Sequence, residues 1–364
     1  MSRTIARILT LVALVALLLA GPGAGPSAAA GDAGNVYTLT NTAAGNAVIA
    51  YARSASGELT WSGTFATQGG GGSLGSQGSV VVSDDGRWLY AVNAGTNNIT
   101  VFGVSGNGLT LTDLVSSNGT QPISVTTSRD LVYVVNATSR TIAGFRSSPA
   151  GTLTPIAGSV RSLIGSGPAE IAFSPSGGVL IVTEKATSSL ETFVVGPDGA
   201  AGAATSYPSS GATPFGFAFG HRDQLFVSEA AGAPAGLSAA SSYQLTESGT
   251  VTTISASVPT TQAAACWLVV TGNGRYAFTA NAASDSISTF AIDQDGSLTL
   301  VIAQAAHSAA AHTTDLALTR NGRFLYANDG GTHMISAFRI GSDGSLERLA
   351  GVTVPAGASG LAAR

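Results

Sequence analysis

Acidic residues that end three β-like runs are the first candidates for chemistry in this 364-residue chain. The runs VLIVTE, QLFVSE and FLYAND end at Glu184, Glu229 and Asp329, whereas the corresponding runs elsewhere end in asparagine. A carboxylate can act as a general base or supply oxygen ligands to a cation. Asparagine has a simpler interpretation, because its side chain caps a following loop through the backbone amides. We therefore assign chemistry only where the repeat departs from asparagine, with Glu184 first.

A second pair of acidic residues, Glu170 and Asp315, begins strands of the same repeat. Pairing across the hairpin turn that follows Glu170 places Glu184 opposite about residue 169, so we expect Glu170 to be its close neighbour. Two carboxylates that close raise the pKa of one of them, which suits a general base near neutral pH or a bound cation such as calcium. His312 precedes the strand of Asp315 and could assist. We predict these four residues as catalytic and no cofactor other than a structural calcium ion.

Ligand-binding candidates lie at the same level of the repeat. Trp267 and Phe215 align with the strand starts, and Arg140 lies on a loop that could reach them. Glu229 and Asp329 complete the predicted substrate-binding set.

Other chemical motifs are missing from the sequence. No metal-ligand spacing such as HxxxH or CxxC occurs, so no metal site of that kind is predicted. Cys266 is interpreted as buried packing, since no histidine is placed near it in the repeat. The glycine-rich GGGGS at 69–73 lacks the context of a phosphate loop and is interpreted as a linker between strands.

One sequence pattern recurs along the chain, and the strands that it predicts must position these side chains. DGRWLYAVNAGTNNITVF at 85–102 is nearly repeated by NGRYAFTANAASDSISTF at 273–290. Each copy has a strand that ends in one polar residue, a loop, and a second strand that holds an aromatic residue. Seven copies follow one another about 48 residues apart. The polar ends are Asn41, Asn93, Asn136, Glu184, Glu229, Asn281 and Asp329, and the aromatic residues are Tyr51, Phe102, Phe145, Phe193, Tyr243, Phe290 and Phe338.

The length of the repeat indicates the fold. Four antiparallel strands in about 48 residues make one propeller blade, whereas β-sandwich modules need about 100 residues and β-helix coils far fewer. The first copy lacks its innermost strand, and PAGASGLAAR at 355–364 matches the missing strand. We therefore predict an all-β, seven-bladed β-propeller with four antiparallel strands per blade, closed by the C-terminal strand completing blade 1.

Blade geometry divides the candidate residues between two rims. The first strand of each blade begins, and the second ends, on one rim, together with the loops between blades. We place a small-molecule site at the central mouth of that rim. The hairpin turns that carry Arg87, Arg275 and Arg323 lie on the opposite rim, which we regard as a poor place for catalysis.

The N-terminus predicts export. An apolar run from Ile8 to Ala20 follows two arginines and precedes an A-x-A cleavage site that ends at Ala30, which is the layout of a secretory signal peptide. We therefore expect a signal peptide over 1–30 and a single propeller domain over 31–364. The mature protein is expected to be secreted, without a membrane insertion.

Composition excludes some partners. The net charge is −4 and the sequence has a single lysine, so no basic surface for nucleic acid is expected. The lone cysteine permits no intramolecular disulfide, so stability must come from packing. The protein is expected to be a monomer.

The last two copies of the repeat carry a family resemblance. NGRYAFTANAASDSISTFAIDQDGSL at 273–298 and NGRFLYANDGGTHMISAFRIGSDGSL at 321–346 resemble the repeat of the lactonase family of seven-bladed propellers, which includes 6-phosphogluconolactonases, and the looser YVTN-type propellers. Family enzymes have a central blade similar to GPRHLAFHPNG and VLNE, with Arg, His and Glu near the mouth. Here the blade reads GPAEIAFSPSG and IVTE: Glu184 is kept, whereas Ala169 and Glu170 replace Arg and His.

The resemblance implies a lactone hydrolase that acts at the central mouth, with Glu184 as the base that deprotonates water. Replacement of the family Arg and His removes the electrophilic partner, so activity could have been lost. Among basic residues only Arg140, Arg161 and Lys185 lie on loops that could reach this rim, so an uncharged lactone fits better than a phosphorylated one. The alternative is a non-catalytic propeller that binds a surface glycan, a peptide or an exported protein.

Overall fold

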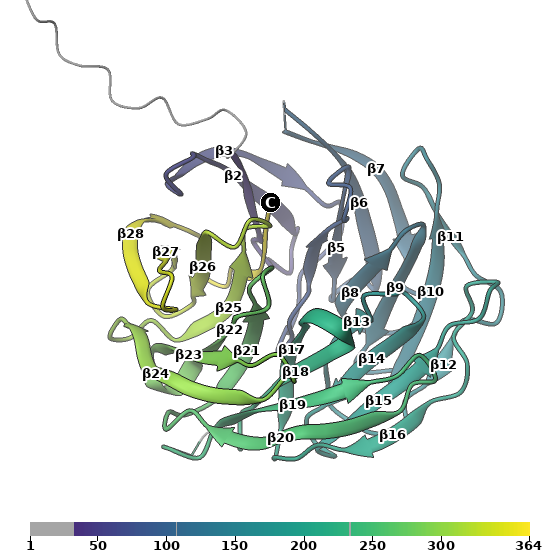
Figure 1. The fold of residues 1–364 in the computed structure, drawn as a ribbon. Coiled ribbons are helices and arrows are strands. Elements are labelled where there is room, and N and C mark those ends of the chain that lie inside the picture. The colour runs from purple at the N-terminus through teal and green to yellow at the C-terminus, as the bar shows by residue number, and fades with distance from the viewer. Residues whose placement is uncertain (1–32, 107, 233) are drawn as a thin grey trace, which may run out of the picture.

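A computed structural model of the chain describes residues 33–106, 108–232 and 234–364. The predicted signal peptide lies outside these residues. Over these ranges the chain forms seven antiparallel sheets that follow one another around a ring, which confirms the seven-bladed propeller (Figure 1). In the same ranges no helix has the length and apolar character needed to cross a membrane.

The first four blades run from an inner strand at the central channel to an outer strand at the edge. Blade 1 comprises β29 (Ser359–Ala363), β1 (Gly34–Leu39), β2 (Ala47–Arg53) and β3 (Leu59–Ala66). Blade 2 comprises β4 (Val80–Val82), β5 (Trp88–Asn93), β6 (Asn98–Ser105) and β7 (Gly108–Ser116). Blade 3 comprises β8 (Pro122–Ser128), β9 (Leu131–Asn136), β10 (Thr141–Ser147) and the outer segments β11 (Leu153–Pro155) and β12 (Arg161–Ser162). Blade 4 comprises β13 (Pro168–Phe173), β14 (Val179–Glu184), β15 (Ser189–Val194) and β16 (Thr205–Pro208).

The last three blades follow the same plan. Blade 5 comprises β17 (Pro214–Phe219), β18 (Gln224–Glu229), β19 (Ala239–Leu245) and β20 (Val251–Pro259). Blade 6 comprises β21 (Ala265–Val270), β22 (Tyr276–Asn281), β23 (Ser286–Ile292) and β24 (Leu298–His307). Blade 7 comprises β25 (Thr313–Leu318), β26 (Phe324–Asp329), β27 (Met334–Ile340) and β28 (Leu346–Thr353). Two short 3-10 helices, His221–Asp223 and Ala282–Ser284, lie in connections of blades 5 and 6.

Local sequence explains why these strands form and turn. The second strands β9 and β14 are almost continuously apolar because both faces of each blade pack against a neighbouring blade. Gly86, Gly274 and Gly322 have φ values of 72°, 66° and 66° in the hairpin turns, a conformation that glycine adopts without steric strain. The seven aromatic residues predicted in the third strands are all buried.

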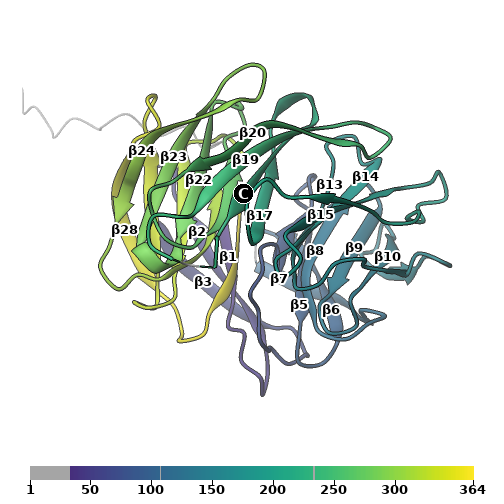
Figure 2. The same cartoon turned by 90° about the horizontal axis from the view of Figure 1, so that it is seen from below.

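The ring closes as predicted. The C-terminal strand β29 pairs with β1, with Val36 opposite Ala363 and Tyr37 opposite Ala362. Figure 2 shows the strands of blade 1 beside those of blade 7. One boundary differs from the prediction, since β1 ends at Leu39 and not at Asn41.

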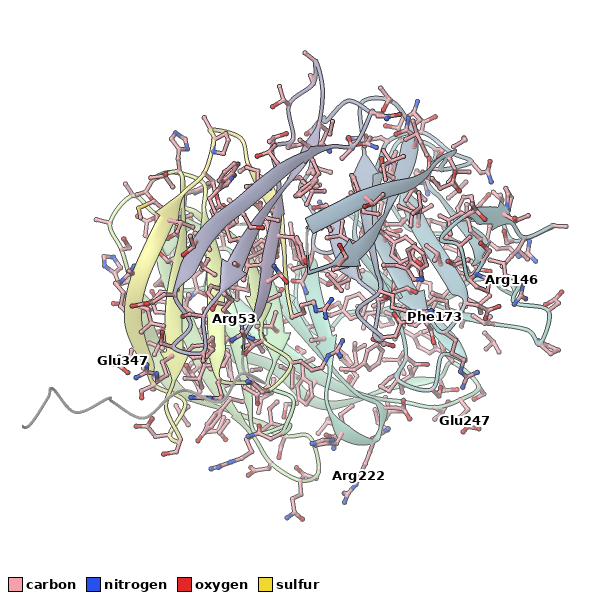
Figure 3. All side chains as sticks on the ribbon, turned by 90° about the horizontal axis from the view of Figure 1, so that it is seen from above. Arg53, Arg146, Phe173, Arg222, Glu247 and Glu347 are labelled. Atoms are coloured by element: carbon pink, nitrogen blue, oxygen red, sulfur yellow. The ribbon has the colours of Figure 1, made fainter. Side chains whose placement is uncertain are left out.

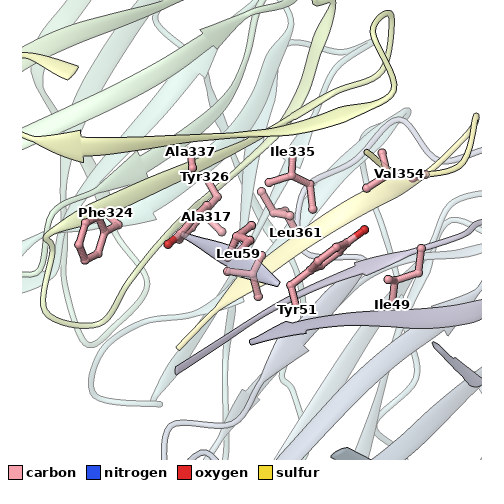
Figure 4. Packing of buried hydrophobic residues seen from close by; sticks show 12 residues of the cluster. Ile49, Tyr51, Leu59, Ala317, Phe324, Tyr326, Ile335, Ala337, Val354 and Leu361 are labelled. Atoms are coloured by element: carbon pink, nitrogen blue, oxygen red, sulfur yellow. The ribbon is translucent and has the colours of Figure 1, made fainter. Parts of the chain in front are cut away.

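Hydrophobic clusters lie between adjacent blades. Figure 4 shows the cluster in which Tyr326 and Ile335 of blade 7 pack near Tyr51 of blade 1 and Leu361 of the closing strand. Each blade therefore depends on its neighbours for stability, as expected of a repeat architecture.

The inner strands of six blades share a β-bulge near the mouth. In blade 4, Pro168 pairs with Glu184 and Glu170 pairs with Thr183, so Ala169 is the extra residue. Because side chains alternate between the faces of a strand, the extra residue changes the face to which the following side chain points.

Candidate active site

Glu184 ends β14 beneath the loop that connects blades 3 and 4. Its side chain is fully buried, and neither carboxylate oxygen has a hydrogen-bond partner among the described residues. Gly165 lies directly over it, since a Cβ there would come within 2.8 Å of Glu184 Cγ. Burial, and then the Glu191 carboxylate, raise the pKa of Glu184 to about 8 against the opposing charges of Arg140 and Lys185. The site therefore contains a carboxyl group that can exchange its proton near neutral pH.

Glu191 on β15 is the carboxylate that accompanies Glu184. Ser189 pairs with Glu184, and Glu191 pairs with Val182, so the two glutamates project from the same face of blade 4. They occupy diagonal positions on adjacent strands, close enough for long side chains to interact.

The loop between blades 3 and 4 fixes Glu191 and not Glu184. The Ile164 amide donates to Glu191 Oε2 at 3.1 Å, and the Gly165 amide donates to Glu191 Oε1. Arg140 donates to the carbonyl oxygens of the same two loop residues. One carboxylate is therefore bound by amides, and the other is free to take up a proton.

Hydrogen-bonding pairs fill the equivalent positions in other blades. In blade 6, Asn281 Nδ2 donates to Ser286 Oγ at 3.2 Å and to Ser288 Oγ at 2.8 Å. In blade 7, Asp329 accepts from Thr313 at 2.8 Å and from Ser336 at 2.5 Å. In these blades the polar residue binds neighbouring strands, and not the following loop as the sequence suggested.

Glu229 in blade 5 shows that a glutamate at this position can be fully hydrogen-bonded. Its Oε1 accepts from Ser241 at 2.5 Å and from the Gly211 amide at 2.8 Å, and its Oε2 accepts from Ser257 at 2.7 Å. Ser241 stands where blade 4 has Glu191. Glu184 differs because it meets an acceptor in place of a donor.

These donors weaken the case for a cation at this rim. The carboxylates of Glu229 and Asp329 already accept from hydroxyl groups. Over the described residues, no three His, Cys, Asp or Glu side chains are grouped as a metal site would need. A calcium ion at the mouth stays a prediction.

Glu170 and Asp315 are buried on the inner strands of blades 4 and 7, and Glu170 connects its blade to the next one. Because of the bulge, Glu170 projects from the face of blade 4 opposite to Glu184, and its Oε2 accepts from the Phe217 amide of blade 5 at 2.6 Å. Asp315 Oδ1 accepts from the Leu316 amide of its own strand at 2.8 Å, and its Oδ2 has no hydrogen-bond partner among the described residues. Burial raises the pKa of both carboxyls well above the usual range. The prediction that Glu170 and Glu184 form one close pair is therefore wrong.

Residues 73–77, which we term the strap, cross the channel mouth. The Lys185 ammonium donates to the Gly75 carbonyl at 2.5 Å, and the Trp267 indole donates to the Ser76 carbonyl at 3.0 Å. Ser76 Oγ donates to the Ile123 carbonyl at 2.8 Å. The glycine-rich segment predicted as a plain linker thus leads into a strap bound to blades 3, 4 and 6.

Gln77 fills the channel beneath the strap. Its side-chain nitrogen donates to the carbonyls of Leu268 at 2.9 Å and Phe217 at 3.2 Å and to Glu170 Oε1 at 3.3 Å. Its side-chain oxygen accepts from the Leu268 amide at 3.0 Å, and its backbone amide donates to the Ala169 carbonyl at 3.1 Å. One residue therefore links blades 4, 5 and 6.

Trp267 and Phe215 are buried and pack against each other, and their role in substrate binding stays a prediction. Their ring centroids are 4.9 Å apart, and the Lys185 nitrogen lies 4.8 Å from the Phe215 ring centroid. Burial lowers the pKa of Lys185. Burial raises the pKa of Cys266 to about 12, which disfavours a thiolate nucleophile.

The remaining predicted residues divide between two places. Arg140 lies with Glu184 and Glu191, held by loop carbonyls. His312 is exposed on the loop between blades 6 and 7, where its backbone amide donates to Asp285 at 2.8 Å. The structure thus gathers Glu184, Arg140 and Lys185, and leaves His312 outside that group.

The sequence matches the profile described as "Lactonase, 7-bladed beta-propeller" over residues 20–163 and 222–360. The chain belongs to this lactonase family. The unmatched stretch 164–221 contains all of blade 4, including Glu184. The match to the lactonase family therefore does not extend to the candidate base.

Several solved structures are similar to the chain over most of its length. A candidate 6-phosphogluconolactonase from Bacteroides fragilis is 18% identical with a TM-score of 0.75, covering 93% of this chain and 100% of its own. A second from Bacteroides uniformis is 19% identical with a TM-score of 0.75, covering 92% and 100%. The periplasmic gluconolactonase of Pseudomonas aeruginosa is 17% identical with a TM-score of 0.69, covering 91% and 99%. These likenesses show the fold alone, and no curated protein matches the sequence.

From the sequence, Glu191 was missed and Lys185 was named only as a basic residue that could reach this rim, although signals for both exist. Glu191 lies two residues before the third-strand aromatic, where other blades have Thr100, Ser241 or Ser288, so alignment of the third strands exposes it. Lys185 is the single lysine of the sequence and directly follows Glu184. Gln77 had no such signal, because its partners are distant in the chain.

Proposed function

We propose that this lactonase-family protein hydrolyses a lactone at the channel mouth, with Glu184 as the general base. The observation that carries the proposal is a buried carboxyl group with two unpartnered oxygens, among the described residues, and a pKa of about 8. A base is most effective when its pKa lies near the pH of the reaction. Glu191 contributes by keeping that pKa high.

In the proposed reaction, the ionised Glu184 takes a proton from water as the water oxygen bonds to the lactone carbonyl carbon. The Lys185 ammonium stabilises the negative charge that develops on the carbonyl oxygen. The bond between that carbon and the ring oxygen then breaks. The proton held by Glu184 passes to the ring oxygen, which gives a hydroxy acid and restores the base.

Access to Glu184 requires movement of the covering chain. The loop with Gly165 lies over the carboxylate, and the strap holds Lys185 through the Gly75 carbonyl. Mobile segments that open for substrate and close over it are common in enzymes. Displacement of the strap would release the ammonium for the carbonyl oxygen of a substrate.

An uncharged lactone suits this mouth better than a phosphorylated one. Trp267 and Phe215 supply apolar surface, and Lys185 supplies one positive charge. Arg140 already donates to loop carbonyls. A phosphate group needs several cations or amides, because it carries close to two negative charges.

The test is hydrolysis of a panel of neutral five- and six-membered lactones, followed by pH-stat. We expect Glu184→Gln to lower kcat by about 100-fold or more. The wild-type rate, corrected for spontaneous hydrolysis, should rise as the pH passes through about 8, where Glu184 ionises. Glu247→Gln is the matched control, because it makes the same change at an exposed residue in the turn between β19 and β20 of blade 5 (Figure 3).

Two outcomes count against the proposal. Hydrolysis that Glu184→Gln leaves unchanged would remove Glu184 as the base. A wild-type protein that turns over none of the lactones would favour the second candidate, a propeller that binds its ligand without turnover. The strap supports that candidate, because it is bound to three blades across the mouth.

We further propose that the protein is exported and cleaved after Ala30, as its N-terminal pattern suggests. N-terminal sequencing of protein recovered outside the cells would then begin at Gly31. Recovery of only the uncleaved chain from the cytoplasm would contradict export. The mass in solution tests the expected monomer.

A further inference from the structure

A groove of about 960 Å³ lies on the rim opposite the mouth, beside the hairpin turn that carries Arg87. It runs between the hairpin turns of blades 2 and 3 and the outer turns of blades 3 and 4. A smaller cavity of about 280 Å³ adjoins it and shares Arg129, Asp130 and Arg146 with it. Figure 3 shows Arg146 near the edge of the molecule. We call the two cavities together the trough.

The floor of the trough combines one fixed aromatic ring with apolar side chains. Trp88 at the start of β5 is half-buried and lines the groove together with Pro149, Pro155 and Ile156. Its ring packs so closely on Gly151 that a side chain at Gly151 would collide with it. A ring held in this way binds an apolar face with little loss of conformational freedom.

The walls of the trough carry charges that neutralise each other. Arg87 Nε lies 2.6 Å from Asp85 Oδ2, and Arg146 forms an ion pair with Asp130. Arg146 also donates to the Asp198 carbonyl at 3.0 Å. Paired charges of this kind present both donors and acceptors without favouring an anion or a cation.

We propose that the trough binds a neutral oligosaccharide. A sugar ring has an apolar face of C–H groups that can lie on Trp88, and hydroxyl groups that both donate and accept. The guanidinium and carboxylate groups of the walls match those hydroxyls in both directions. A charged polymer would need one sign of charge, and a peptide strand would need an unpaired strand edge or deep side-chain pockets.

The size of the trough supports an extended ligand. Small-molecule sites usually have volumes of about 300–1,000 Å³, and the larger cavity alone is near the upper end of that range. The adjoining cavity lengthens it across Arg129 and Asp130. Binding here does not depend on lactone hydrolysis, because the mouth lies on the opposite rim.

The test is calorimetric titration of the protein with three neutral hexasaccharides, namely cellohexaose, maltohexaose and N-acetylchitohexaose. We expect at least one to bind, and Trp88→Ala to weaken its binding by about tenfold or more. Thr154→Arg should do the same by filling the groove from an exposed position, without altering the packing of Trp88. Trp61→Ala is the matched control, because Trp61 is exposed on β3 in blade 1.

The outcomes separate this inference from the proposed hydrolysis. Weaker binding in both trough variants with unchanged lactone hydrolysis supports an independent sugar site. Binding that neither variant affects would place the sugar elsewhere and overturn the proposal. The proposal also fails if none of the three hexasaccharides binds.

Discussion

Blades 4 and 6 share one backbone arrangement but differ in chemistry where the second strand ends. In blade 6, Asn281 donates to the hydroxyl groups of Ser286 and Ser288. In blade 4, Glu184 stands in the place of Asn281, and Glu191 in the place of Ser288. A donor and an acceptor have become two acceptors, so one carboxyl must keep a proton or bear an unpaired charge.

The difference shows how this fold can gain a reactive group without a new loop. We call the polar residue that ends the second strand, together with its partner on the third strand, the joint of a blade. Two substitutions at this joint are enough, because the joint is already buried and burial alone raises the pKa of a carboxyl. Blade 5 has only one of the two substitutions, and its Glu229 is fully hydrogen-bonded. The second acid, Glu191, therefore distinguishes the candidate site from an ordinary joint.

The largest expected effect comes from placing the second acid in blade 6. Ser288→Glu should destabilise the protein by about 3–5 kcal/mol at neutral pH, because it buries a charge whose one nearby donor is the neutral Asn281 amide. Blade 6 offers the Ala303 carbonyl at this place, which accepts from Ser288 at 2.7 Å, whereas Glu191 receives loop amides. Urea unfolding measures the change. A cost no greater than that of Ser288→Ala would show that any blade accepts the acid, and would contradict the comparison.

The next effect is on the pH dependence of stability. The pKa of Glu184 is raised from 4.5 to about 8, so the folded state holds a proton that the unfolded state releases between these values. The wild-type free energy of unfolding should therefore fall with rising pH across this window, by up to about 1.4 kcal/mol per pH unit. Glu184→Gln should remove that contribution, which unfolding at pH 5, 6, 7 and 8 would measure. Parallel profiles for wild type and variant would contradict the assignment.

A smaller effect is expected where the strap connects blade 4 with blade 6. Gln77→Ala should cost about 2 kcal/mol, because it removes bonds to Glu170 and Leu268 and leaves buried groups unpaired. It should also expose the strap to proteolysis. Gln121→Ala is the control, since the half-buried Gln121 side chain contacts the strap through one bond to Ser73. Equal effects of the two variants would show that Gln77 does not anchor the strap.

The smallest effect should come from the ordinary joint itself. Asn281→Ala should cost about 1–1.5 kcal/mol, because Asn281 donates two bonds and one hydrogen bond contributes about 0.5–1.5 kcal/mol net. A double-mutant cycle with Ser288→Ala isolates the pair. A coupling energy near zero would mean that the interaction between Asn281 and Ser288 does not stabilise blade 6. Blades 4 and 6 would then differ at this place only in the burial of a carboxyl group.

Much of the fold could be predicted from the sequence because propeller contacts repeat along the chain. Each blade packs against the next, so the period of about 48 residues, the third-strand aromatics and the closing strand at 359–363 were all readable. Glu184 could be selected for the same reason, since it breaks a pattern. Its supposed partner Glu170 could not be judged, because the bulge at Ala169 changes the face to which Glu170 points.

The sequence by itself determined the number of blades, their order and the closure of the ring, since these follow from spacing and from alternation of apolar and polar residues. Only the tertiary structure decided which acids meet and what covers them. Glu191 reaches Glu184 through strand register, and Gln77 reaches Leu268 across 191 residues of chain. Such contacts depend on the directions in which bulges and loops orient the side chains. The periodicity of a sequence does not predict those directions.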